Sequence, residues 1–406
     1  MNNTKLILCL LFVSAFAKAQ QLQNYIQEAV ANNPDIQTFE LRYNIAQEKV
    51  KEAKWIPNTE VSAGFFVSEP ETRVGAQRAK IGIKQMLPWF GTITARENYA
   101  TSLADAEYIE ITIAKRKLAL TVSRSYYKLY SIKAKQLIID KNIQLLNTYE
   151  RLALTSVEVG KASAVDVLRL QIRQNELEQQ KEILYQKFLA ERSNFNSLLN
   201  KDENAMVIVP SKIDIPEVDL LTEDAALILN PELIKFDEIY ESITESQMLN
   251  QKESFPMIGF GLDYLPVSER SDINLIDNGK DILMPMISVS IPVFNNRYKS
   301  ISRQNDLRKK EVRTQKEQRS NVLYSTLAKA KYERNQARIS YNKQIDNLKQ
   351  ANNAEEILIK NYETGTIDFN DVLDIQELQL KFQINRIESV QMYYIQSALI
   401  NYLTQL

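Results

Sequence analysis

Two closely similar stretches decide how this chain folds: Gly160-Lys-Ala-Ser-Ala-Val-Asp-Val-Leu168 and, 205 residues later, Gly365-Thr-Ile-Asp-Phe-Asn-Asp-Val-Leu373. Each begins with a glycine, which readily takes the left-handed conformation that ends a helix. In the first stretch Ser163 precedes Asp166 by three residues, the spacing of a capping box at the start of a helix. Each stretch therefore predicts the tip of a helical hairpin, near 157–166 and 362–371.

Other landmarks recur in the same order with nearly the same offset. The pairs are Asn33-Pro34 and Asn230-Pro231, Pro57 and Pro256, and Pro88-Trp-Phe-Gly91 and Pro292-Val-Phe-Asn295. Ordered landmarks at an almost constant spacing indicate an internal repeat. We therefore predict a tandem duplication, with a first repeat over 20–205, a linker over 206–220 and a second repeat over 221–406.

Glycine and proline are scarce, with 9 and 11 in 406 residues, and residues 92–159, 161–209, 293–364 and 366–406 contain neither. Stretches without these breakers predict long helices. A helix over 92–159 would be about 100 Å long at ~1.5 Å per residue, so it has to pack against other helices along its length. Apolar seams are expected on the returning helices at i, i+3, i+4 spacing. The seam residues are Val165, Leu168 and Ile172, and Leu380, Ile384 and Ile387.

Four segments alternate between apolar and small or polar residues, at about 58–68, 78–87, 255–265 and 283–292. This period predicts strands with one apolar face. It fits an ordinary half-buried sheet, or a barrel wall with lipid outside and water inside. Export and the long helices favour the barrel wall. Because four strands cannot close a barrel, several chains would have to share one.

The first nineteen residues are expected to be a secretory signal peptide. Lys5 precedes an apolar run over 6–16, and Ala17-Lys18-Ala19 fits a cleavage site. The run is too short to cross a bilayer as a helix, and no later apolar run approaches the 18 residues required. A protein of this kind would enter a membrane by strands.

Composition excludes several classes of function. The chain has no histidine, and its only cysteine, Cys9, lies in the expected signal peptide. The commonest general base and the commonest transition-metal ligands are therefore missing. A net charge of −1 offers no field of one sign to hold nucleic acid. We expect no enzyme, no cofactor, no metal site and no nucleic-acid partner.

Acidic residues follow both predicted tips, and they have two interpretations. Asp166, Asp371 and Asp374 lie in the first turns of the returning helices. Acids favour helix N-termini because of capping and the helix dipole. If several copies surround one axis, the same acids become rings of carboxylate, which select cations. Asp368 precedes Asp371 by three residues, as Ser163 precedes Asp166. Spacing alone favours capping for Asp166, Asp368 and Asp371 and leaves Asp374 undecided.

The chain resembles the TolC-type outer-membrane efflux proteins over almost its whole length. The features that carry this resemblance are the duplication, the Asn-Pro elements, the passage from strand to helix at Leu87–Gly91 and the two tips. The resemblance implies a mainly helical fold with a transmembrane β-barrel portion. Each protomer of a homotrimer would give four strands to a shared twelve-stranded barrel in the outer membrane of a Gram-negative bacterium, in contact with its lipid. The helices would continue through the periplasm. A periplasmic adaptor and an inner-membrane pump of the RND or ABC type are the implied partners.

The resemblance also implies site residues. Asp371 and Asp374 match aspartates that ring the periplasmic entrance, and Asp166 and Tyr362 match a polar network that holds the tips shut. Ile367 stands where some members carry an arginine of this network, and Arg169 is a candidate substitute. The residues that resemble the adaptor-docking surface are Val159, Gly160, Val167, Leu168, Gly365, Val372 and Leu373.

The cargo stays open at this point. Small molecules, heavy-metal ions and proteins of type I secretion all pass through such ducts, and Met284-Pro285-Met286 resembles ducts for heavy metals. Two thioethers near a strand are also compatible with simple wall packing. A periplasmic coiled coil with no pore is the alternative from another class. A hydrolase with paired carboxylates is disfavoured by the duplicated, elongated pattern.

Overall fold

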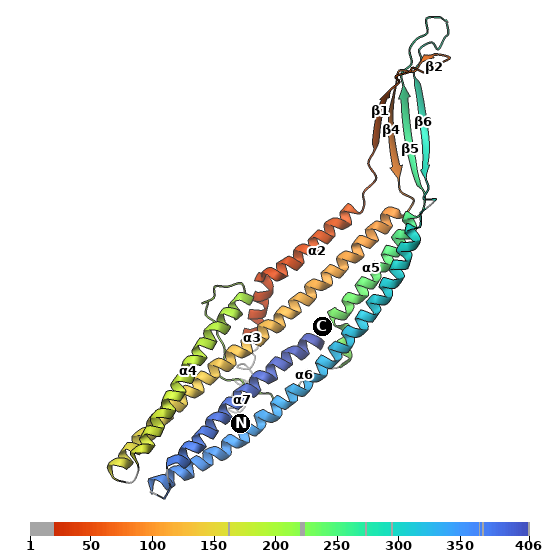
Figure 1. Cartoon of the computed structure of the whole chain (residues 1–406). Helices are drawn as coiled ribbons and strands as arrows, with labels where there is room; N and C mark the ends of the chain where they lie inside the picture. Colours follow the sequence, from red (N-terminus) through yellow and green to blue (C-terminus); the bar gives the residue numbers. More distant parts are fainter. Residues whose placement is uncertain are drawn as a thin grey trace, which may run out of the picture. The chain divides into compact units, whose positions relative to one another are not determined.

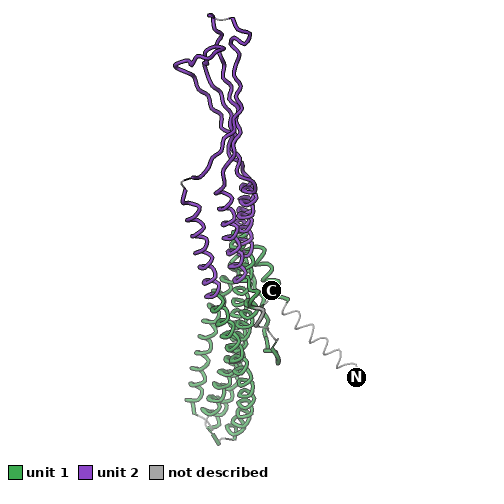
Figure 2. The backbone as a smooth tube through the Cα atoms, turned by 90° about the vertical axis from the view of Figure 1, so that its right-hand side faces the viewer, with its two compact units in different colours: residues 1–39, 111–231, 319–406 green, residues 40–110, 232–318 purple. Residues whose placement is uncertain are grey.

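The computed structural model describes residues 20–160, 163–219, 224–272, 274–293, 295–364, 366–367 and 369–404. The chain divides into two compact units (Figure 2): residues 1–39, 111–231 and 319–406 form unit 1, and residues 40–110 and 232–318 form unit 2. Each unit takes segments from both repeats, so the compact units are not the repeats themselves. The expected signal peptide, 1–19, lies outside the described residues.

Long helices dominate, as predicted (Figure 1). Residues 20–32 are helical, and the further helices are α2 (Pro34–Glu52), α3 (Thr92–Glu158), α4 (Ala164–Leu198), the 3₁₀ helix η1 (Asp224–Leu229), α5 (Pro231–Glu253), α6 (Arg297–Glu363) and α7 (Phe369–Thr404). The strands are β1 (Glu60–Phe65), β2 (Glu71–Thr72), β3 (Gly75–Ala76), β4 (Ala79–Leu87), β5 (Met257–Leu265) and β6 (Ile282–Ser290). The order of helix, strands, 67-residue helix, turn and returning helix occurs twice.

Unit 2 contains a four-stranded antiparallel sheet in the order β1-β4-β5-β6. One strand pair comes from each repeat, and β4 joins β5 between them. The short hairpin β2–β3 lies within the connection over 68–78, which the sequence pattern predicts as an irregular loop. The outer strands β1 and β6 each pair on one side only within the described part of the chain.

The two faces of this sheet differ sharply. The register sets Val61 opposite Ile83, Ile83 opposite Leu262 and Leu262 opposite Pro285, so the apolar residues of all four strands share one face. That face is bare, with Phe65 87% and Ile287 75% exposed. The opposite face carries small and polar residues, including a buried Asp263 that is ion-paired with Lys80. No described residue covers the apolar face.

Aromatic side chains gather where unit 2 passes from strands to helices. Trp89 stacks on Phe255 with ring centroids 5.7 Å apart and meets Phe90 edge-on at 5.9 Å. Arg96 lies over the ring of Trp55 at 4.5 Å. Gly91 has φ +79°, which a residue with a side chain rarely adopts, and α3 starts directly after it.

In unit 1 two similar hydrogen bonds occur, one in each predicted repeat. The Asn33 side-chain amide donates to the carbonyl of Leu198 at the end of α4, at 2.9 Å. The Asn230 amide donates to the carbonyl of Leu403 at the end of α7, at 3.0 Å. Leu198 and Leu403 are 205 residues apart, the same offset as the two tips. The Asn-Pro elements therefore fix the end of the returning helix in each repeat.

The segment over 206–219, here called the strap, packs onto the helices of unit 1. The Tyr130 hydroxyl on α3 accepts a bond from the Ile213 amide at 3.2 Å, and the Tyr341 hydroxyl on α6 donates to Asp214 at 3.0 Å. Arg338 on α6 pairs with Asp219. The strap therefore lies against helices of both repeats. Among the described helices none carries an apolar stretch of the length that crossing a membrane requires.

Candidate functional site: the two helical tips

The first tip connects α3 to α4 and uses local capping. Gly160 adopts φ +73°, and its amide donates to the carbonyl of Val157 at 3.0 Å. Ser163 is the N-cap of α4: its hydroxyl accepts from the Val165 amide at 3.2 Å, while the Ser163 amide donates to the Asp166 carboxylate at 3.3 Å. This arrangement confirms the capping box predicted from the sequence. The buried Asp166 therefore holds its own helix start.

The second tip connects α6 to α7. The amide and the hydroxyl of Thr366 both donate to the carbonyl of Asn361, at 3.0 and 2.8 Å, and the Thr364 hydroxyl donates to the same carbonyl at 2.9 Å. Three donors on one carbonyl close the end of α6. Gly365 and Asp368, both singled out by the sequence pattern, lie outside the described residues.

An apolar cluster joins the two tips. Its members come from α3, α4, α6 and α7 and include Val167, Leu170, Tyr362, Phe369 and Val372. The Tyr362 ring meets the Phe369 ring edge-on, 4.8 Å between centroids. Leu373 and Ile367 are partly buried against the same cluster. Tyr362, expected in a polar network, therefore has its ring in the apolar interior between the hairpins.

Burial divides the residues expected to dock an adaptor. The side chains of Val167 and Val372 are buried and hold the hairpins together, whereas Val159, Gly160 and Leu168 are exposed. The predicted seam of α4 is also exposed, with Val165, Leu168 and Ile172 at 50%, 57% and 59%. The apolar stripe that the spacing predicts is present, but it stays exposed on the described chain. The interior side of α4 instead consists of Val167, Leu170 and Leu177. α4 thus carries two apolar stripes, one of them bare.

Polar contacts link α4 to α7 next to the tips. The Arg169 guanidinium donates to the Asn370 side-chain oxygen in the first turn of α7. Four residues further along α4, Arg173 lies 3.7 Å from the carboxylate of Glu377. Arg169 was singled out by the sequence pattern, but Arg173, Asn370 and Glu377 were not. Arg169 and Arg173 are four residues apart on α4 and therefore lie on one face of that helix, and this spacing was the signal available in the sequence.

Asp371 and Asp374 are exposed on the first two turns of α7. Within the described residues neither carboxylate has an ion-pair partner. They are three residues apart and therefore lie on neighbouring positions of one helix face. The structure thus leaves two adjacent acids on the surface of the second tip.

A duplicated set of hydrogen bonds lies behind the tips. Gln174 on α4 donates to Asn147 and Glu150 on α3, both at 3.0 Å. The corresponding residues form the same bonds in the second hairpin, where Gln379 on α7 donates to Asn352 and Glu355 on α6 at 3.1 and 2.8 Å. All three pairs of positions differ by 205. Sequence reasoning missed them, although the shared offset was visible.

Hydrogen bonds behind the tips shift the pKa values of two side chains, Glu150 and Tyr149. Donation from Gln171 and Gln174 holds the pKa of the Glu150 carboxyl below its usual range. Burial, together with the bond from the Tyr149 hydroxyl to Glu355, raises the pKa of the Tyr149 phenol. Both effects favour the protonation states that bind the helices together at neutral pH.

Residues 25–195, most of the first repeat, match the model of the outer membrane efflux protein family. The first repeat is therefore similar to the outer membrane efflux proteins, which are passive channels and not enzymes. No curated protein matches the chain in sequence.

Solved structures share the fold. The chain is similar to the channel CusC with a TM-score of 0.77 at 13% identity, covering 95% of this chain and 92% of that one. It is similar to VceC of Vibrio cholerae with a TM-score of 0.73 at 16% identity, covering 95% and 96%. It is also similar to the open state of MtrE of Neisseria gonorrhoeae, with a TM-score of 0.74 at 14% identity, covering 95% of this chain and 88% of that one.

Proposed function

We propose that three copies of this chain share one twelve-stranded barrel in the outer membrane and form the exit duct of a tripartite pump. The observation that carries this proposal is the sheet of unit 2, with a bare apolar face and two outer strands that each pair on one side only. Unpaired strand edges are unfavourable in lipid, because no water is present to satisfy their backbone groups. Pairing β6 of one copy with β1 of the next removes both edges.

Strand length supports the same conclusion. β4, β5 and β6 each have nine residues, and a tilted strand that crosses a bilayer needs about 9–11. The aromatic cluster lies directly beside the ends of two strands, because Trp89 and Phe90 follow β4 and Phe255 precedes β5. Aromatic rings of this kind are enriched at membrane–water boundaries. The helices would then lie in the periplasm.

The exposed acids give this duct an entrance. Around a threefold axis, Asp371 and Asp374 of three copies become two rings of carboxylate, which attract cations. The contacts of Arg169 with Asn370 and of Arg173 with Glu377 tie α4 of the first hairpin to α7 of the second hairpin. We infer that these contacts hold the entrance shut, with Asp166 and Tyr362 in a supporting role within the hairpin starts and the apolar cluster.

The exposed stripe of α4 and the first tip suit a periplasmic adaptor. Val159, Gly160 and Leu168 are exposed together with Val165 and Ile172. Exposed apolar patches of this kind mark protein contacts. An inner-membrane pump of the RND or ABC type would supply the energy, because the duct has none of its own. Small molecules or heavy-metal ions are the proposed cargo.

Two neighbouring substitutions in β6 test the membrane assignment. Ile287 lies on the bare apolar face and Met286 on the opposite face. A lysine facing lipid near the middle of the membrane costs about 2–4 kcal/mol. Ile287→Lys should therefore abolish detergent-resistant trimers in outer-membrane fractions, whereas Met286→Lys should retain them.

Equal tolerance of both substitutions would contradict a lipid-facing sheet. A wild-type chain recovered as a water-soluble monomer or dimer would favour a periplasmic coiled coil without a pore. Proteins, rather than small cargo, secreted by wild-type cells and lost on deletion would indicate type I secretion.

A further inference from the structure

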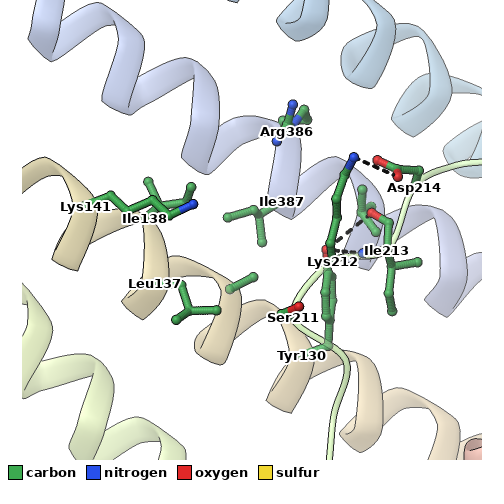
Figure 3. A pocket seen from close by; sticks show the side chains of 12 residues that line it. Tyr130, Leu137, Ile138, Lys141, Ser211, Lys212, Ile213, Asp214, Arg386 and Ile387 are labelled. Atoms are coloured by element: carbon green, nitrogen blue, oxygen red, sulfur yellow. Dashed lines mark hydrogen bonds and ion pairs between the residues drawn. The ribbon is translucent and has the colours of Figure 1, made fainter. Parts of the chain in front are cut away.

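A partly enclosed cavity of about 310 Å³ lies under the strap in unit 1 (Figure 3). It is bounded by α3 of the first repeat, by the strap, and by α7 of the second repeat. No part of the duct mechanism uses it. Its volume falls at the lower end of the range of about 300–1,000 Å³ that small-molecule sites occupy.

The floor of this strap cavity is aliphatic. It is formed by Ala134, Leu137, Ile138, Ile387 and Val390. In Figure 3 the Ile387 side chain lies between Lys141 on one side and Lys212 on the other. Apolar walls with a few charged groups at the rim are typical of sites for amphipathic ligands.

The strap wall is held in place by hydrogen bonds. The Tyr130 hydroxyl accepts from the Ile213 amide at 3.2 Å and donates to its carbonyl at 3.4 Å. The Tyr394 hydroxyl donates to the Asp214 carbonyl at 2.8 Å. A wall fixed on both sides makes the cavity preformed, which lowers the entropic cost of binding.

Positive charge exceeds negative charge at the rim. The Asp214 carboxylate is already satisfied, because Lys212 lies 3.1 Å from one oxygen and the Tyr341 hydroxyl donates to the other at 3.0 Å. Lys141 and Arg386 have no ion-pair partner within the described residues, and both line the cavity. An anion placed between them would meet two cations that are not ion-paired with any carboxylate in the described part of the chain.

We propose that the strap cavity binds a small organic anion with an apolar body, such as a medium-chain carboxylate. The apolar body would rest on the aliphatic floor, and the carboxylate would accept hydrogen bonds from Arg386 and Lys141, which are stronger than those between neutral groups. The site stands independently of the proposed function, because it needs neither a trimer nor a pore.

Binding would also join parts of the two repeats. The ligand would contact α3, the strap and α7 at once, and a ligand that binds only the folded state raises its stability by mass action. Octanoate should therefore raise the thermal midpoint of the helical signal of the wild type. The effect should be lost when the rim cations are removed.

Octanoate binding to the full-length protein in lipid nanodiscs tests this proposal, measured by calorimetry after subtraction of empty discs. One double variant combines Arg386→Gln with Lys141→Gln. The control is Lys381→Gln, at an exposed lysine on α7 that does not line the cavity. We expect saturable binding to the wild type and the control, at least tenfold weaker in the double variant. Octanol, which lacks the charge, should bind the wild type and the double variant equally.

The helical thermal midpoint without ligand shows whether the double variant is folded. Wild-type protein that does not bind octanoate above the empty discs would overturn the proposal. So would equal octanoate affinity in the wild type and a folded double variant. If the double variant fails to fold, Lys141→Gln alone, at an exposed position, should still weaken binding at least threefold, and unchanged binding in that variant would also overturn the proposal.

Discussion

The two helical tips have one backbone plan but carry different chemistry. Position by position, with an offset of 205, Asp166 of the first tip corresponds to the exposed Asp371 of the second, and Arg169 corresponds to Asp374. Asp166 is buried in its capping box, and Arg169 binds the neighbouring hairpin. The same two positions therefore hold the helices together in the first repeat and leave exposed negative charge in the second.

The apolar residues differ in the same way. Phe369 begins α7 and is buried to 1% exposure, whereas its counterpart Ala164 begins α4 in an exposed position. The predicted seam is buried on α7, where Leu380 and Ile387 belong to the interior, but bare on α4. The second hairpin therefore buries its apolar stripe within the described chain, whereas the first hairpin leaves one apolar stripe exposed.

The largest expected effect follows from the aromatic start of α7. Phe369→Ala removes a ring that contacts both Tyr362 and Tyr149. Truncating a buried phenylalanine costs about 3–5 kcal/mol. Hydrogen exchange should show the opening free energy of the α6–α7 tip lowered by this order.

The counterpart of Phe369 is already an alanine, so the comparison in the first hairpin is Leu168→Ala, at an exposed apolar position. Surface changes of this kind stay within about 0.5 kcal/mol. Similar losses at both tips would contradict the division between an interior and an exterior hairpin.

A smaller difference is expected in the duplicated hydrogen bonds. Gln379 is buried, so Gln379→Ala leaves Glu355 and Asn352 with fewer partners and should cost about 1–3 kcal/mol. Gln174 is only half-buried, so water can replace its bonds, and Gln174→Ala should cost about 0.5–1.5 kcal/mol. Hydrogen exchange in the two hairpins measures the loss of stability caused by each substitution. A larger loss for Gln174→Ala would reverse the comparison.

The smallest effect concerns pH and the first hairpin. The pKa of Glu150 is lower in the folded state, so its contribution to stability is present above the usual carboxyl value of about 4.3 and is lost as pH falls through the lower folded value. Thermal midpoints between about pH 6 and pH 3 should therefore fall less steeply in a variant combining Gln171→Ala with Gln174→Ala. An unchanged slope in that variant would assign the acid sensitivity to other groups.

Local features were the most predictable part of this molecule. The capping box of Ser163 and Asp166 was predictable because its bonds join residues three apart. The two 67-residue helices were predictable from the absence of glycine and proline. The alternating strands were predictable from their period, but not the β4–β5 pairing that joins the repeats, because it brings together residues about 180 positions apart.

The candidate site was less predictable, since it depends on which helix face turns inward. α4 carries apolar residues on two faces, and its spacing alone does not decide between Leu168 and Leu170. The contact of Arg169 with Asn370 joins two helices that are far apart in sequence. The strap over 206–219 has no regular period, so its fixed place on the helices came only from the structure.

Single-channel conductance in planar bilayers tests the central claim most directly, with wild-type protein and with Asp371→Asn combined with Asp374→Asn. The account predicts small, cation-selective currents that divalent and trivalent cations block in the wild type. In the double variant both the selectivity and the block should be strongly reduced. Currents with unchanged selectivity and unchanged block in the double variant would contradict an acidic entrance. The duct itself would be contradicted by folded, trimeric protein that never conducts, even when Arg169→Ala removes a contact between the hairpins.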